Sequence, residues 1–471
     1  MTRSRKITLL ARLALAGLSV ASLAIALIIA LSGRLADMSL SAAVSVCAVL
    51  VGTMLAAGIT SVRLGPSGAV RVTLELASIG VALLAAEAAT CAFVPEPGST
   101  QQERKLDADR LGLAFDLRTR SEVVAEMRDR GIDAMPGISR EWPRLPRVRQ
   151  QLPEGLYPLS DASNADVVEC NESGHYLVFH SDDFGFNNPA GLIASGDVDV
   201  AAVGASFTLG HCVDRGMSVV AQLRRSYPKL ANLGIAGSGT LSMLATFREY
   251  VEPLKPPLVL WIMHPWTADT RDELGDPLLA RYLEPDFSQH LIERRQEIDR
   301  AWRDIAVQVQ YEFDRRVQLA VAQRQQQRYA GILTLSQLRK RLHLNEQLAR
   351  PAAALDLSPF RRTVDLARRT TEGWGGRFVV VIMPLYAEVV AHDLAEPLRH
   401  DHLAAMLRAM GVTVIDTVPT FLDNSDPASL YVMRRNNHPT AEGHRLLARY
   451  IATELRTPAP AARLAVQRDP P

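Results

Sequence analysis

The chain has 471 residues, of which 52 are basic and 51 acidic, so its formal net charge is +1. This balance does not favour nucleic-acid binding or a strongly acidic partner, and 4 cysteines do not make a disulfide scaffold. The sequence has no C-x-x-C, H-E-x-x-H, P-loop or G-x-G-x-x-G motif. We therefore expect neither a metal site nor a cofactor.

The first hundred residues are far more apolar than the rest of the chain. Leu13–Leu31 and Met38–Val62 are charge-free apolar runs long enough to cross the hydrocarbon core of a bilayer. Val72–Val94 is a third run, although it contains Glu75 and Glu87. We expect a membrane anchor over residues 1–95, with three transmembrane helices at about 10–31, 38–62 and 72–94.

The sidedness of this anchor follows from its basic residues. Arg3, Arg5, Lys6 and Arg12 precede the first run, so the positive-inside rule places the N-terminus in the cytoplasm. Three spans then put everything after Pro95 outside the cytoplasm, whereas two would leave it inside; we favour three. A cleaved signal peptide is disfavoured because no clear A-x-A site occurs and a second span follows at once.

An acidic residue within a span is by default a sign of function. We favour the plainer interpretation for Glu87, in which its side chain lies near the outer interface and reaches water.

The remaining chain alternates short apolar runs with helical patterns. Residues 96–184 form a juxtamembrane extension, charged and proline-rich at first, with one surface helix expected within Arg118–Gly131. Strands are expected at Val198–Val203, Ala231–Ile235, Leu258–Met263, Arg377–Met383 and Val412–Ile415. Helices are expected at Val219–Tyr227, Leu241–Val251, Phe360–Thr371, His402–Met410 and Ala441–Leu455. Nearly continuous apolar strands separated by helices predict a parallel sheet covered on both faces, an α/β three-layer sandwich over residues 185–455.

One helical insertion, at about 288–345, interrupts the alternation. Ile298, Trp302, Ile305, Val309 and Phe313 recur at spacings of three and four, which is typical of an amphipathic helix. The insertion could pack on the sandwich, cover the site or pair with another subunit, and we favour packing. The tail over 456–471 is expected to be disordered.

The segment Val198–Gly216 is the most informative for chemistry. A strand leads into GASFTLG, where Ser206 stands just beyond the strand end and could present its hydroxyl above the sheet. A serine there is usually only a turn residue, and Thr208 breaks the G-x-S-x-G pattern.

Two other segments strengthen the case for Ser206. NLGIAGSGT follows the second strand, and an amide there, such as that of Gly237, could donate to an oxyanion. His438 lies just before the last helix, where it could serve as the base that a serine nucleophile needs.

These segments, in this order, resemble the SGNH/GDSL hydrolase family, and more closely a membrane-anchored subgroup of the bacterial envelope. The resemblance covers roughly residues 185–455 and is also carried by CNESGHYLVFHSDDFGFNNPAG, which starts at Cys170. It implies a flavodoxin-like sandwich and ester chemistry. The implied roles are Ser206 as nucleophile, His438 as base, and the amides of Ser206 and Gly237 as oxyanion donors.

The sequence departs from the family pattern in three places. Ala205 replaces the aspartate of G-D-S, His264–Asp269 lacks the expected asparagine, and Asn436 replaces the aspartate two residues before His438. Losing an oxyanion donor costs about 10²–10³ in rate, and losing the acid of a triad about 10⁴.

Other residues could substitute for the missing groups. Thr267 or His264 could replace the missing donor, and Asp423 or Asp426 could orient the histidine. Without such substitutes, turnover would be slight.

Cys170 and Cys212 lie in the soluble part, and Cys212 is close to the expected nucleophile turn. We expect them to form a disulfide if the compartment is oxidising, with two buried thiols as the alternative.

Two functions compete. The first is an extracytoplasmic serine esterase or O-acyltransferase, held at the bacterial inner membrane, that acts on an ester of a cell-envelope glycan or lipid. The alternative is a catalytically impaired protein of the same fold that binds glycan or partners in envelope assembly. The expected partners are the bilayer and an acyl-ester substrate. A third and weaker interpretation, transport or signalling through the spans, lacks a polar pathway.

Overall fold

The computed structural model describes residues 66–93, 101–330, 355–392 and 398–457 except Asn436, together with Leu9, Leu335 and Leu394. The chain divides into two compact units. One comprises residues 1–97 with 318–354, and the other residues 98–317 with 355–471. The first two expected spans and residues 458–471 of the expected tail lie outside the described residues, whereas Arg456 is the last residue of a helix.

The first unit contains the helix α3, Pro66–Phe93, where the third span was expected. Within the described residues it is the one helix long and apolar enough to cross a membrane, over Val70–Ala89. Arg71 and Glu75 form an ion pair at 2.9 Å near its start. Glu87 is fully buried rather than open to water, so the interpretation of this residue as solvent-facing is wrong.

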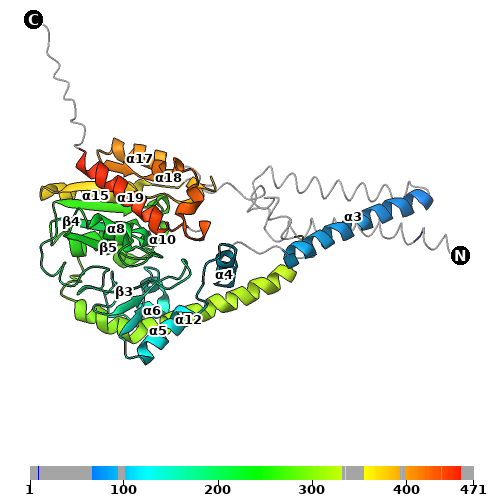
Figure 1. The fold of residues 1–471 in the computed structure, drawn as a ribbon, viewed down its shortest axis with the longest axis horizontal. Coiled ribbons are helices and arrows are strands. Elements are labelled where there is room, and N and C mark those ends of the chain that lie inside the picture. The colour runs from blue at the N-terminus through cyan, green and yellow to red at the C-terminus, as the bar shows by residue number, and fades with distance from the viewer. Residues whose placement is uncertain are drawn as a thin grey trace, which may run out of the picture. The chain divides into compact units, whose positions relative to one another are not determined.

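The second unit is built on a five-stranded parallel sheet (Figure 1). Its strands are β4 (Val200–Gly204), β5 (Leu230–Gly234), β6 (Leu258–Met263), β7 (Arg377–Ile382) and β8 (Thr413–Asp416). The spatial order is β5-β4-β6-β7-β8, which is the flavodoxin-like order 2-1-3-4-5. Every residue of β4 and β5 is buried, as expected for strands covered on both faces. The predicted α/β class is therefore confirmed.

Helices cover both faces of the sheet. The chain moves one way along the sheet from β4 to β5 and the other way from β5 to β6, so right-handed crossovers place the two connecting helices on opposite faces. Accordingly, the first of these helices packs against the last helix of the chain, and the second against the helix that precedes β7. The bounds of the helices around the sheet are α7 (Ser206–Leu209), α8 (Val219–Leu223), α9 (Thr240–Thr246), α10 (Arg271–Leu274), α11 (Pro277–Arg281), α15 (Ser358–Gly373), α16 (Tyr386–Val389), α17 (His400–Ala409), α18 (Val418–Leu422) and α19 (Ala441–Arg456).

The five strands and five helices expected for this unit are present, with shifted ends. The helix expected over Leu241–Val251 is α9 followed by a π-helical turn at Phe247–Val251. The helix expected over Val219–Tyr227 ends early, at Leu223. The surface helix α5, Arg120–Asp129, starts at a capping box in which Thr119 and Glu122 satisfy each other's backbone amides.

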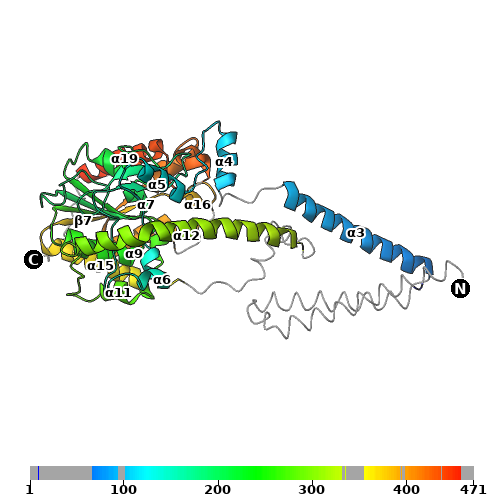
Figure 2. The ribbon, with the colours of Figure 1, turned by 90° about the horizontal axis from the view of Figure 1, so that it is seen from below.

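The expected helical insertion begins as one long helix, α12, Arg295–Ala330 (Figure 2). Ile298, Trp302, Ile305 and Val309 are buried in the core of the second unit, so the first half of α12 packs as predicted. Phe313 is 49% exposed and does not continue this buried face.

The extension before the main sheet contains a second, small sheet that the sequence pattern did not predict. Its strands are β1 (Ala134–Pro136), β2 (Asp166–Val168) and β3 (Val178–His180), in that spatial order. The first pair is parallel and the second antiparallel. Two short helices, α4 (Gln101–Arg110) and α6 (Pro146–Arg149), complete this extension. The extension belongs to the same compact unit as the sandwich.

Candidate active site

The nucleophile candidate Ser206 lies where β4 ends, at the first residue of the short helix α7. This turn depends on glycine. A Cβ on Gly204 would lie 1.9 Å from Thr208 Oγ1 and 2.6 Å from the carbonyl oxygen of Ile262, so only a residue without a side chain lets α7 approach the sheet. Strands β4 and β6 flank the point where the strand order reverses, which is where ligands bind in open α/β sheets.

His438 reaches the same place from the far end of the chain. Its backbone carbonyl accepts a hydrogen bond from Val432 N at 2.9 Å, and Tyr431 pairs with Pro439 in an antiparallel bridge. These contacts hold the segment that leads into α19. The Nε2 atom of His438 lies 2.9 Å from Ser206 Oγ, which is hydrogen-bonding distance. The structure thus brings together two residues that are 232 positions apart.

The second nitrogen of this ring contacts an acid that sequence analysis missed. His438 Nδ1 lies 2.7 Å from Glu172 Oε2. Glu172 belongs to the connection between β2 and β3, in which Leu177 N donates to the carbonyl of Cys170. The alternative acids suggested for this role do not fill it, and Asp426 instead pairs with Arg434 at 2.8 Å. Asn436, expected in the place of the acid, lies outside the described residues.

The electrostatics of Glu172 fix the direction of these hydrogen bonds. Burial on its own would raise the pKa of the Glu172 carboxyl, but the charge of His438, its hydrogen bond and the neighbouring Arg104 hold that pKa well below its usual value. An ionised carboxylate can only accept, so His438 Nδ1 carries the hydrogen. In the neutral imidazole Nε2 is then the acceptor and Ser206 Oγ the donor, which is the arrangement of an activated serine.

Aromatic and histidine rings surround this chain of hydrogen bonds. The rings of Phe207 and His211 lie 5.6 Å and 4.9 Å from the ring of His438. His264 follows β6, at the position of the family's missing asparagine, and its ring is 5.5 Å from that of Phe207. Burial, and then the charge of His438, lower the pKa of His264 to about 4, so this imidazole is neutral at ordinary pH.

The two other expected oxyanion residues differ in their surroundings. Gly237 lies in the loop after β5, and β5 is the neighbour of β4, the strand that leads to Ser206. Its φ of +74° favours glycine. Thr267 is buried, and its hydroxyl donates to the carbonyl of His264 at 2.7 Å. That bond stabilises the local turn and uses the hydrogen that Thr267 would need as an oxyanion donor. His264 therefore fits the role better than Thr267.

Cys170 and Cys212 are joined by a disulfide, with their Cα atoms 5.6 Å apart. Two groups here are of the size that could hold a metal ion: both sulfurs with His211, and the Cys212 sulfur with Glu172 and His438. A disulfide sulfur is not a thiolate, however, and the remaining ligands in each group are too few for a structural zinc site.

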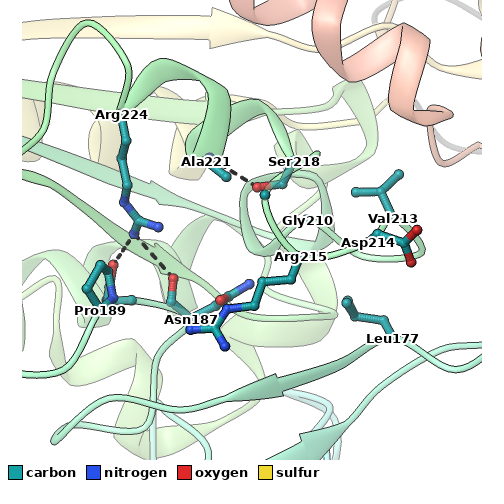
Figure 3. A pocket seen from close by; sticks show the side chains of 12 residues that line it. Leu177, Asn187, Pro189, Gly210, Val213, Asp214, Arg215, Ser218, Ala221 and Arg224 are labelled. Atoms are coloured by element: carbon teal, nitrogen blue, oxygen red, sulfur yellow. Dashed lines mark hydrogen bonds between the residues drawn. The ribbon is translucent and has the colours of Figure 1, made fainter.

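A small pocket of about 140 Å³ adjoins the loop that follows α7 (Figure 3). Gly210, Val213 and Arg215 line it on one side, and Arg224, the residue after α8, on another. Arg224 donates to the backbone carbonyl of Asn187 at 3.2 Å. Ser206 and His438 are not among the residues that line this pocket, so it is distinct from the space above the serine hydroxyl.

Comparison with known proteins gives distant structural likenesses. No protein-family model and no curated protein sequence matches the chain. A lipolytic protein of the G-D-S-L family from Veillonella parvula aligns at 12% identity and a TM-score of 0.30, over 56% of this chain and 100% of its own. A catalytic mutant of an acetylxylan esterase from Geobacillus stearothermophilus aligns at 14% identity and a TM-score of 0.30, over 55% of this chain and 93% of its own. Likenesses this distant transfer no function, which must be argued from the site itself.

Proposed function

We propose that this protein is a serine esterase or O-acyltransferase of the SGNH type, with Ser206 as nucleophile, His438 as base and Glu172 as the acid that orients the base. The observation that carries the proposal is the continuous chain of hydrogen bonds, 2.9 Å from Ser206 to His438 and 2.7 Å from His438 to Glu172. A free serine hydroxyl is a weak nucleophile at neutral pH, and this arrangement is the established way to activate it.

The reaction follows from the geometry. Ser206 Oγ attacks the ester carbonyl while its proton passes to His438 Nε2, and Glu172 stabilises the imidazolium that forms. The carbonyl oxygen becomes an oxyanion. The amide of Ser206 is a suitable donor because the first N–H groups of a helix have no acceptor within it. Gly237 and neutral His264 are the other proposed donors.

The second half of the reaction returns the enzyme to its starting state. His438 gives its proton to the leaving alcohol, and the acyl group stays on Ser206. Water or an acceptor hydroxyl then removes it, with His438 again acting as base. Water gives an esterase and a sugar hydroxyl an O-acyltransferase.

The proposed substrate is an ester of a cell-envelope glycan or lipid, on the outer side of the inner membrane. The apolar helix α3 supports attachment to a membrane. The Cys170–Cys212 disulfide supports an oxidising compartment, because disulfides rarely persist in the cytosol. The three-span topology is part of this proposal.

Purified full-length protein should hydrolyse p-nitrophenyl acetate, and a fluorophosphonate probe should label it at Ser206. Ser206→Ala should abolish both. Ser121→Ala is the matched control. It removes another hydroxyl that donates to a neighbouring acceptor, Asp314, and should change neither hydrolysis nor labelling. Equal hydrolysis by wild type and Ser206→Ala would refute the proposal.

The second candidate is a binding protein that retains the fold without turnover. Two departures from the family pattern favour it. Ala205 stands where the family has an aspartate, and His264–Asp269 contains no asparagine. Retained glycan binding together with no fluorophosphonate labelling of Ser206 would favour this candidate over the enzyme.

A further inference from the structure

The acid of the proposed triad lies in an unusual place, on the connection between β2 and β3 of the small sheet. Several contacts tie this connection to the extension itself. Asn171 Nδ2 donates to the carbonyl of Asp116 at 2.8 Å, and Asp116 N donates to Gly174 O at 2.7 Å. Arg104 lies 3.4 Å from Glu172 Oε1. None of these contacts fixes Glu172 relative to Ser206 or His438.

The disulfide provides a covalent link between the extension, which carries Glu172, and the sandwich, which carries Ser206 and His438. Cys170 is two residues before Glu172, and Cys212 lies in the loop that follows the nucleophile helix α7. A second link, the ion pair between His175 and Asp214 at 2.6 Å, is exposed and therefore weak. His211 Nε2 also approaches Glu169 at 3.2 Å.

The disulfide also lies directly against the reacting groups. Cys212 Sγ is 3.2 Å from Glu172 Oε2, the same oxygen that accepts from His438, and 3.8 Å from His438 Nδ1. Both cysteines are buried in a cluster with Val432, whose backbone amide donates to the His438 carbonyl. The sulfur atoms therefore contact the acid and the segment that holds the base.

We infer that Cys170 and Cys212 are positioning residues, whose disulfide holds the Glu172 carboxylate against His438. This inference rests on the proposed function. Reduction by a dithiol breaks the S–S bond and forms two thiols, with two electrons and two protons supplied by the dithiol, which becomes a disulfide. The connection between β2 and β3 then loses its covalent link to the loop after α7, and the new Cys212 thiol can donate to the oxygen that His438 needs.

The test compares oxidised full-length protein with the protein after reduction, and with the Cys170→Ala/Cys212→Ala variant. We expect kcat for p-nitrophenyl acetate to fall roughly 10- to 100-fold, because small misplacements of a catalytic group have costs of this size. The acidic limb of the kcat/KM profile should move to lower pH, since the imidazolium loses its neighbouring anion. His175→Ala, which breaks only the exposed ion pair, is the matched control and should leave both unchanged.

A double-mutant cycle separates positioning from general stability. If the disulfide acts through Glu172, then Glu172→Gln should cost much less in the cysteine-free variant than in the oxidised protein. Fully additive losses, or unchanged kcat and pH profile after reduction confirmed by mass analysis, would overturn the inference. NMR titration of labelled His438 gives a second readout that needs no turnover, and an unchanged titration on reduction would equally overturn it.

If oxidised wild type shows no Ser206-dependent hydrolysis, the proposed function has failed. The titration of His438 then still decides whether the disulfide positions Glu172.

Discussion

Replacing Glu172 by glutamine tests the proposed triad at the residue that the sequence did not reveal. The change keeps the shape of the side chain but removes its charge. The carboxylate lies 2.7 Å from His438 Nδ1 and is 15% exposed. At this separation Coulomb's law gives about 1.5 kcal/mol at the dielectric constant of water and about 6 kcal/mol at an effective value of 20. Since the carboxylate is mostly buried, we expect the loss to lie towards the larger figure.

A loss of this size corresponds to a fall in kcat of roughly 10⁴-fold, which is also the cost found when the acid of a serine triad becomes an amide. The assay is hydrolysis of p-nitrophenyl acetate under saturating substrate. Glu126→Gln, which neutralises an exposed carboxylate paired with Arg118, is the control and should keep wild-type kcat. A Glu172→Gln enzyme within about 3-fold of wild type, with Ser206→Ala inactive, would show that Glu172 is not the orienting acid.

Three further outcomes follow from the structure. His264→Ala should lower kcat/KM roughly 10²- to 10³-fold if the neutral ring is an oxyanion donor, and His264→Asn should keep most of the activity; equal kcat/KM for His264→Ala and wild type would exclude that role. Gly204→Ala should destabilise the fold by about 1–3 kcal/mol in urea titrations, because the new Cβ would lie 1.9 Å from Thr208 Oγ1 and 2.6 Å from a backbone carbonyl. Unchanged stability would mean that α7 can shift without cost. Burial and the charge of Glu169 raise the pKa of Asp161 to about 8, so the folded state binds more protons than the unfolded state between about pH 4 and 8, and stability should fall as pH rises through that window. Asp161→Asn should flatten this dependence in urea titrations at pH 5 and pH 9, and parallel curves for variant and wild type would contradict it.

The main sheet could be predicted because its strands β4 to β7 are short, continuous apolar runs that are buried along almost their whole length. Val259 and Val380, for example, lie in stretches buried on both faces, and such stretches are visible in the sequence. The small sheet could not be predicted in this way. Its strands have three residues each, and β3 exposes His180 next to buried Phe179, so no periodic signal develops over so short a length.

The proximity of Ser206 and His438 could be predicted for a related reason. Ser206 and His438 each lie at the end of an element that the sequence shows, a strand for the first and a helix for the second. Glu172 lies on a turn of the small sheet, 266 positions from the histidine that it contacts, and no local pattern connects the two. The one usable signal was Cys170, since a disulfide to Cys212 brings the nearby acid to the nucleophile turn.

The position of Glu172 changes how the departures from the family pattern should be weighed. A carboxylate orients a histidine through its distance to Nδ1, so the segment that supplies it is chemically irrelevant. With Glu172 in contact with Nδ1, the proposed triad does not require an acid two residues before His438. What remains against turnover is the missing donor at the end of β6, and there His264 offers a neutral imidazole rather than an empty position.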